Sequence, residues 1–459
     1  MDEQERKQAN MKNWANLSRS ILNGVVGDYL EKEQNPLAID MAFYHLDQAL
    51  DLHADLAQQM MSKPDKALSN KVIILIHGLT NLETVWDFKA NDVSNAALET
   101  ALKNDNYGLR LQDSVGFTPF YLRYNTGLAI KKNGQELNAL LSNLIASYPI
   151  QIDEIVLMGF SMGGLLARSA QYIAQETEAE WLDKLSNCYY IGTPHEGSPL
   201  EKFGHLTSAI VRLMPREYIS LWADWIDVRS EGIQDLKHGL LHLKSEDSRP
   251  IPNQDDPYEQ SVRCGSFYVG AQHHFVSGAL SEKTGSLVNK FFGDSLVRHT
   301  SANPIAAPED CKMAHFDGIP HIPLAHSERV YQQIKQWFDE HETKQVLYYA
   351  PSLDGACDQT RKTSAKADHV LSNQEIIAGT IDLLVTAYDQ TVNTVEKMHH
   401  SIADEPLNLL KKVPVVSEIT HPISDTHKEI LNTIYFSLKE GGKLMHKGAK
   451  FINLKGNKT

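Results

Sequence analysis

A single serine, Ser161, lies between glycines in the stretch VLMGFSMGGLLARSA, which begins at Val156. The apolar residues before it predict a buried strand, and those after it predict a helix. A Gly-x-Ser-x-Gly motif at such a turn strains the serine backbone and presents its hydroxyl as a nucleophile. Gly159, Gly163 and Gly164 let strand and helix approach closely, and the helix N-terminus favours an oxyanion on an attacked carbonyl. We interpret Ser161 as a catalytic nucleophile, with an ordinary glycine-rich turn as the alternative.

A second motif, LIHGLT, places His77 and Gly78 at the end of an earlier apolar run. Where a serine follows a strand in this way, an N–H from such a loop joins the N–H after the nucleophile in binding the oxyanion. The candidate donors are the backbone amides of Leu79 and Met162. The alternative interpretation is a plain glycine turn after a strand.

A serine nucleophile needs a base, and the base needs a carboxylate that orients it; the expected chain order is Ser, acid, His. Asp294, in the loop FFGDSLV, is the first candidate for the acid, and Asp317 is its competitor. His321 lies within a later Gly/Pro loop and is the first candidate for the base. His326 directly precedes the last helix of this region and is the second candidate. His315 lies in a predicted strand, where a core or sheet role is expected.

The elements that position these residues alternate between strands and helices. Helical stretches begin near Gly134 and just after Ser161, and another covers residues 328–338. This alternation is typical of a doubly wound, mostly parallel sheet with helices on both faces. Residues 11–30 predict an amphipathic helix with Trp14, Leu17, Ile21, Val25 and Tyr29 on one face. The predicted strands are the apolar runs KVIILIHGL from Lys71, PFYLRYN from Pro119, EIVLMGF from Glu154, CYYIGTP from Cys188 and SFYVG from Ser266.

The composition of the 459 residues narrows the class of protein: 42% are hydrophobic, enough for a sizeable core, and the net charge is -14. Such a charge argues against a nucleic-acid partner. The four cysteines form no C-x-x-C pair, no signal peptide is recognisable, and no apolar run approaches ~20 residues. We expect a cytoplasmic protein with at most weak peripheral membrane contact. No dinucleotide motif is present, and the histidine pairs at 273–274 and 399–400 point apart, so we expect no cofactor and no metal.

Taken together, the motifs HGL, YNTGL, NGQELNALL, GFSMGGLLARSA, IGTPHEGSPLEKFG, RSEGIQDLKHG, GDSLV and HIPLAHSERVY resemble a known family. The chain is similar to bacterial α/β-hydrolases of the lipase/esterase kind, related to GPI inositol-deacylase-like serine hydrolases, over roughly residues 70–340. The resemblance implies Ser161 as nucleophile, Asp294 as acid and His321 as base. Ser295 departs from it, because glycine is common at that position of the acid loop.

The block GDSL, which begins at Gly293, also gives its name to a different serine esterase family. In that family the serine of the block is the nucleophile and lies near the N-terminus. Here the block is late, no Asp-x-x-His follows at the matching place, and a nucleophilic Ser295 would leave the Ser161 motif unexplained. We therefore prefer Ser161.

The region around residues 197–262 breaks the alternation, and we expect it to act as a lid and an acyl pocket. Trp222 and Trp225 either line that pocket or pack the insertion on the body. The polar stretch after residue 345 and the helical pattern that follows predict a separate C-terminal part. The expected organisation is an N-terminal helical extension (1–69), an α/β-hydrolase domain (70–345), a linker (346–370) and a C-terminal helical region (371–459).

The sequence therefore predicts a serine hydrolase that cleaves carboxylic, lipid-like esters through an acyl-enzyme on Ser161. An acyltransferase or a thioesterase with the same triad is the first alternative. A non-catalytic scaffold that binds through the helical C-terminus is the alternative from another class. The expected partner is a small-molecule or lipid ester, and the sequence predicts no oligomeric state.

Overall fold

The computed structural model describes residues 3–45, 48–60, 68–88, 105–195, 230–238, 267–279, 308, 310–340, 346–348 and 439. The chain divides into two compact units. The first comprises Met1–Tyr29, Ala38–Ser208 and Arg229–His369 and contains the sheet described below. The second comprises Leu30–Leu37, Ala209–Val228 and Val370–Thr459.

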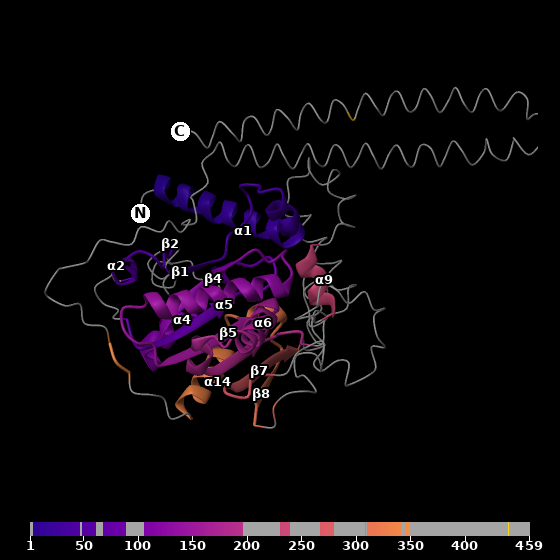
Figure 1. The fold of residues 1–459 in the computed structure, drawn as a ribbon. Coiled ribbons are helices and arrows are strands. Elements are labelled where there is room, and N and C mark those ends of the chain that lie inside the picture. Colours follow the sequence, from indigo (N-terminus) through magenta and orange to yellow (C-terminus); the bar gives the residue numbers. More distant parts are fainter. Residues whose placement is uncertain are drawn as a thin grey trace, which may run out of the picture. The chain divides into compact units, whose positions relative to one another are not determined.

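The first unit is organised around an eight-stranded sheet with the order β2-β1-β4-β3-β5-β6-β7-β8. Neighbouring strands from β4 to β8 are parallel, whereas β1 is antiparallel to both β2 and β4. The sheet is therefore mostly parallel, as the sequence predicts (Figure 1). Its strands are β1 (Ala42–His45), β2 (Gln48–Ala49), β3 (Lys71–Ile76), β4 (Thr118–Arg123), β5 (Glu154–Phe160), β6 (Leu185–Ile191), β7 (Gln272–Ala279) and β8 (Lys312–Asp317).

Strand β3 shows why helices cover both faces of this sheet. All six of its residues are buried, and successive side chains of a strand point to opposite faces. Val72, Ile74 and Ile76 pack with α5 (Ile130–Ser147) and α6 (Met162–Glu176) in one core cluster. Ile73 and Leu75 pack with α4 (Tyr107–Val115) and α14 (Glu328–Asp339) in another. A continuous apolar run is what such a strand, buried on both faces, requires.

Four of the five predicted strands are confirmed, and the fifth is wrong. The described part of this run, residues 267–270, does not form a strand: the chain turns at Val269 and Gly270, and Val269 is 96% exposed. The strand is β7, which starts at Gln272 and carries two buried histidines. His273 stacks on Tyr190 and His274 on Tyr189. Their ring nitrogens also form hydrogen bonds, His273 with the Tyr190 hydroxyl and the Tyr268 carbonyl and His274 with the Asn187 side chain.

The N-terminal helix is also observed, as α1 (Glu3–Lys32), with a non-helical Val26 (φ -133°, ψ 24°). Its predicted apolar face is only partly correct, because Leu17 is 45% exposed whereas Ser20 and Asn23 are buried. Strands β1 and β2 precede residue 70, so the sheet begins before the predicted start of the hydrolase domain.

Short helices complete the described part of the chain. These short helices are α2 (Leu56–Met60), the 3-10 helices η1 (Glu83–Trp86) and η2 (Glu180–Lys184), α9 (Glu231–His238) and α13 (His321–Leu324). No helix in the described part of the chain, short or long, is both long enough and apolar enough to span a membrane.

Candidate active site

Ser161 occupies the one-residue junction between β5 and α6. Its backbone has φ 54° and ψ -123°, a conformation that residues other than glycine rarely adopt. Such a residue costs about 1–3 kcal/mol and persists only where its surroundings hold it. Two backbone hydrogen bonds do so: the Ser161 N–H donates to the Ile191 carbonyl (2.8 Å), and the Ser161 carbonyl accepts from the Gly164 N–H (3.1 Å).

The glycines around Ser161 are required by close backbone contacts. A Cβ atom on Gly159 would lie 2.5 Å from the Cα of Gly164. A Cβ atom on Gly163 would lie 2.3 Å from the Ile76 carbonyl oxygen. Helix α6 therefore begins directly against β5 and against the end of β3. This contact places the start of α6 beside the loop that contains the HGL motif.

His321, at the start of α13, directs its Nε2 atom to the Ser161 hydroxyl, and the distance from Nε2 to Oγ is 3.0 Å. Both side chains are nearly buried, at 6% exposure for Ser161 and 7% for His321. Burial lowers the pKa of His321 from 6.5 to about 4. The imidazole is therefore neutral at pH 7, which is the form that can accept a proton from a serine.

The other candidates for base and acid lie elsewhere. His315 is on β8, where its Nδ1 atom lies 2.9 Å from the Ser277 hydroxyl. Its Nε2 atom lies 3.4 Å from Asp317, whose side chain is 88% exposed. His326 follows α13 and is only partly exposed. Among the described residues, Asp317 forms no hydrogen bond or ion pair with His321, so the structure does not pair the competitor acid with this histidine.

Several predicted features lie outside the described residues. They include the favoured acid and most of the 197–262 insertion, of which only α9 and Ser230 belong to the described part. The predicted residues outside the described part are Asp294, Ser295, Trp222, Trp225, the pair 399–400 and the C-terminal helical region apart from Lys439.

Among the residues that the structure describes, no group of three or more histidine, cysteine, aspartate or glutamate side chains could hold a metal ion.

The two predicted oxyanion donors belong to segments that adjoin the nucleophile. Met162 is the first residue of α6, so its N–H has no acceptor within the helix. A Cβ atom on Gly78 would lie 2.9 Å from the Ser161 Cβ, which places the HGL loop against the serine. Among the residues that the structure describes, neither the Leu79 nor the Met162 amide donates a hydrogen bond. Amides with no acceptor among the described residues, in segments that adjoin a strained serine, fit what an oxyanion site needs.

His77 supports the HGL loop from inside the protein. Its Nδ1 atom lies 2.9 Å from the Gly78 carbonyl, and its ring stacks on Tyr124 at 4.7 Å. The Tyr124 hydroxyl donates a hydrogen bond to the His77 carbonyl (2.9 Å). Burial lowers the pKa of His77 to about 4, so it is neutral at pH 7. The contacts of His77 with Gly78 and Tyr124 thus hold the backbone of the loop in place.

Helix α9 belongs to the predicted insertion and contacts the residues of both predicted oxyanion donors. Its residues Ile233 and Leu236 pack with Leu79 and Met162 in a small apolar cluster. Asp235 accepts a hydrogen bond from the first N–H of α5 (2.8 Å). The RSEGIQDL motif contains these residues, but only the folded chain shows which carboxylate caps which helix.

The mostly parallel sheet, the strained serine between β5 and α6 and the histidine that follows β8 define an α/β-hydrolase fold. The chain matches no protein-family model and no curated protein. Among solved structures, it is similar to lipase BlEst2 of Bacillus licheniformis in its mature form, with 16% identity, a TM-score of 0.34 and coverage of 60% of this chain and 93% of the lipase.

Two further structures resemble it to a similar degree. The esterase PF2001 of Pyrococcus furiosus is 15% identical, with a TM-score of 0.31 and coverage of 59% of this chain and 82% of the esterase. An α/β-hydrolase fold protein of Chitinophaga pinensis is 14% identical, with a TM-score of 0.33 and coverage of 60% and 92%. The fold assignment rests on the sheet and the serine turn described above. The lipase and esterase activities are those of the two named proteins.

Proposed function

We propose that this protein is a serine hydrolase that cleaves carboxylic esters, with lipid-like esters as its substrates. The observation that carries the proposal is the 3.0 Å distance between His321 Nε2 and the hydroxyl of the strained, nearly buried Ser161. A nucleophile within hydrogen-bond reach of a neutral imidazole is the arrangement that acyl transfer to serine requires. A cytoplasmic location and the relation to GPI inositol-deacylase-like enzymes are part of this proposal.

In the first half-reaction, the Ser161 hydroxyl attacks the ester carbonyl while His321 takes its proton. The negative charge that develops on the carbonyl oxygen is stabilised by the amides of Leu79 and Met162. The tetrahedral intermediate collapses to an acyl-enzyme, and His321 returns the proton to the leaving alkoxide. Asp294, as the acid of the triad, holds the imidazole in the tautomer that presents Nε2 to the serine.

In the second half-reaction, water attacks the acyl-enzyme and His321 again accepts and returns the proton. The products are a carboxylic acid and free Ser161. The near-complete burial of Ser161 and His321 favours this chemistry, because electrostatic interactions are stronger where water is excluded.

The test is hydrolysis of a series of p-nitrophenyl esters with acyl chains of increasing length. We expect Ser161→Ala to lower kcat by at least roughly 10³-fold, because the covalent step is lost. Ser142→Ala is the matched control, since Ser142 is exposed on α5 and its hydroxyl donates to the Asn138 carbonyl of the same helix. Full activity in the Ser161 variant would contradict the proposal. Added alcohol acceptors separate hydrolysis from acyl transfer, since only a transferase gives mainly transesterified product.

A further inference from the structure

The loop that contains the Leu79 amide is held by contacts from outside the hydrolytic site. Asn81 donates twice within the loop, from its N–H to the Gly78 carbonyl (3.2 Å) and from its side-chain amide to the Leu79 carbonyl (3.0 Å). The carbonyl of Asn81 in turn accepts a hydrogen bond from Ser20 Oγ, at 2.6 Å. Ser20 belongs to α1 and is 1% exposed. The N-terminal helix therefore contacts the loop that contains the predicted oxyanion donor, two residues after Leu79.

Thr80, the residue directly after Leu79, has φ 60°, which is an outlier for a β-branched residue. The Thr80 N–H donates to Oγ1 of Thr126, at 3.2 Å. On its other side it meets α1, because a Cβ atom on Gly24 would lie 2.4 Å from the Thr80 methyl group. A strained residue persists only where its surroundings over-determine it, and these contacts supply that constraint from two directions.

The part of α1 that contacts the loop is itself fixed. At Val26 the helix loses its regular backbone angles, which frees carbonyl groups for other donors. Ser230 donates its hydroxyl proton to the Gly24 carbonyl (2.7 Å), and the Asn125 side-chain amide donates to the Gly27 carbonyl (2.9 Å). This stretch of α1 is thus bonded both to the residue that precedes α9 and to the loop after β4.

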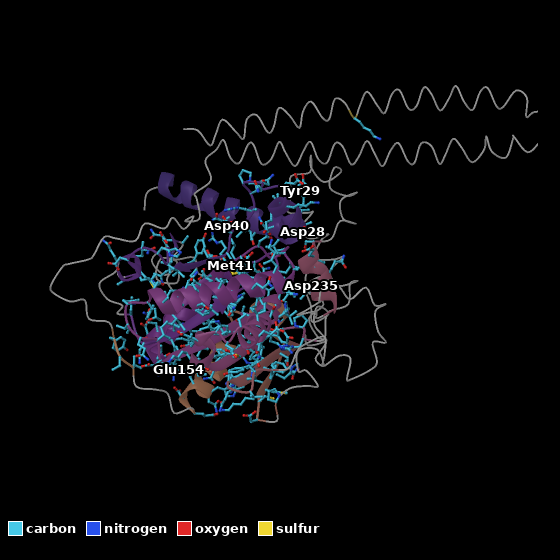
Figure 2. The ribbon with its side chains drawn as sticks, in the orientation of Figure 1. Asp28, Tyr29, Asp40, Met41, Glu154 and Asp235 are labelled. Carbon is cyan, nitrogen blue, oxygen red and sulfur yellow. The ribbon has the colours of Figure 1, made fainter. Side chains whose placement is uncertain are left out.

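A third bond joins α1 to α9. The Glu231 N–H, at the start of α9, donates to the Asp28 carboxylate on α1 (3.2 Å). Figure 2 labels Asp28 on α1 and Asp235 on α9, the residue by which α9 also holds the first N–H of α5. Residues 20–28 of α1, which we call the α1 clamp, are therefore attached on one side to the Leu79 loop and on the other to α9 and the loop after β4.

We propose that the α1 clamp, through Ser20, and the loop after β4, through Thr126, hold the Leu79 amide toward Ser161 as positioning elements. The inference rests on the proposed function and goes beyond it, because it assigns a role to an N-terminal segment that provides no reacting group. The Leu79 amide acts on the charge that develops in the transition state. Loss of its position must therefore lower kcat and leave KM nearly unchanged.

The test compares variants that remove a bond with variants that keep it. Loss of one oxyanion donor costs roughly 10²–10³ in kcat, so we expect a displaced donor in Thr126→Val or Ser20→Ala to cost roughly 10- to 100-fold. KM should stay within about threefold, and affinity for a trifluoromethyl ketone inhibitor should fall in parallel with kcat. Thr126→Ser and Ser20→Thr keep the hydroxyl and should restore kcat. Thr177→Val and Ser142→Ala are the matched controls, since their hydroxyls bond at the far end of α6 and on exposed α5.

A third variant separates positioning from folding. Gly24→Ala raises the helix propensity of α1 but directs a Cβ atom at the Thr80 methyl group, so it should lower kcat while the melting temperature falls only modestly. The clamp alone is overturned if both Gly24→Ala and Thr126→Val keep kcat within threefold of wild type while Ser161→Ala is inactive. If Ser161→Ala keeps wild-type activity, the proposed function fails and the clamp fails with it.

Discussion

The contact of Gly163 with the end of β3 leads to the sharpest prediction about rate. In Gly163→Ala, the added Cβ atom would lie 2.3 Å from the Ile76 carbonyl oxygen and 2.6 Å from that of His77, whereas ordinary contacts begin at 3.4 Å. Both carbonyl oxygens belong to the backbone and cannot rotate away, so the start of α6 must move about 1 Å away from the end of β3. The first amide of α6, that of Met162, moves with it.

The expected effects on stability and on rate differ in size. Overpacking costs about 1–3 kcal/mol, and the higher helix propensity of alanine returns up to about 1 kcal/mol, so the free energy of unfolding should fall only modestly. A misplacement of about 1 Å at a reacting centre can cost roughly 10²-fold in rate. We therefore expect kcat for a p-nitrophenyl ester to fall roughly 100-fold in a protein that remains folded at the assay temperature.

Gly270→Ala is the matched control for this variant. A Cβ atom on Gly270 would meet only the outer part of the Tyr268 side chain, which can move away. Melting temperatures and kcat of both variants are measured side by side. A kcat within threefold of wild type in Gly163→Ala would refute the claim that the position of the Met162 amide matters for catalysis.

Three further predictions concern charges. Burial lowers the pKa of His321 to about 4, and a carboxylate partner raises it, so Asp294→Asn should shift the acid limb of the kcat/KM profile toward pH 4 and lower its maximum roughly 10⁴-fold. An unshifted limb with full activity would exclude Asp294 as the acid. Lys71 is fully buried with its Nζ atom 3.5 Å from Glu154, so Glu154→Gln should lower the free energy of unfolding by about 3–5 kcal/mol in urea titrations, and a loss below 1 kcal/mol would contradict this. Burial raises the pKa of Asp235 from 3.8 to about 6, so the free energy of unfolding falls as pH rises from about 4 to about 6. Asp235→Asn should therefore raise the melting temperature at pH 7 but not at pH 4. A variant with no gain at pH 7 would contradict this prediction.

Much of the fold is predictable because a strand buried on both faces needs an unbroken apolar run. The runs from Lys71 and Glu154 meet this condition, and both form central strands. The run from Ser266 does not, because its apolar residues belong to a turn and the strand that follows buries His273 and His274 instead. Histidines whose partners are aromatic rings give no apolar signal in a sequence.

The residues of the site, too, are only partly predictable from the sequence. Ser161 and His321 are predictable because a strand-to-helix turn with small flanking residues and a histidine in a late loop are local patterns. The supports of the Leu79 loop are not predictable: Ser20 looks like the polar face of an amphipathic helix, and its partner Asn81 is 61 positions away in the chain. Such contacts between distant polar residues appear only in the folded protein.

The central claim, that Ser161 is a nucleophile activated by His321, is tested most directly by reaction with a fluorophosphonate probe and mass spectrometry of the labelled peptide. We predict one label per chain on Ser161, no label in Ser161→Ala, slow labelling in His321→Ala, and unchanged labelling in Ser142→Ala. No label on wild-type protein, or a label on Ser295 that persists in Ser161→Ala, would contradict the account.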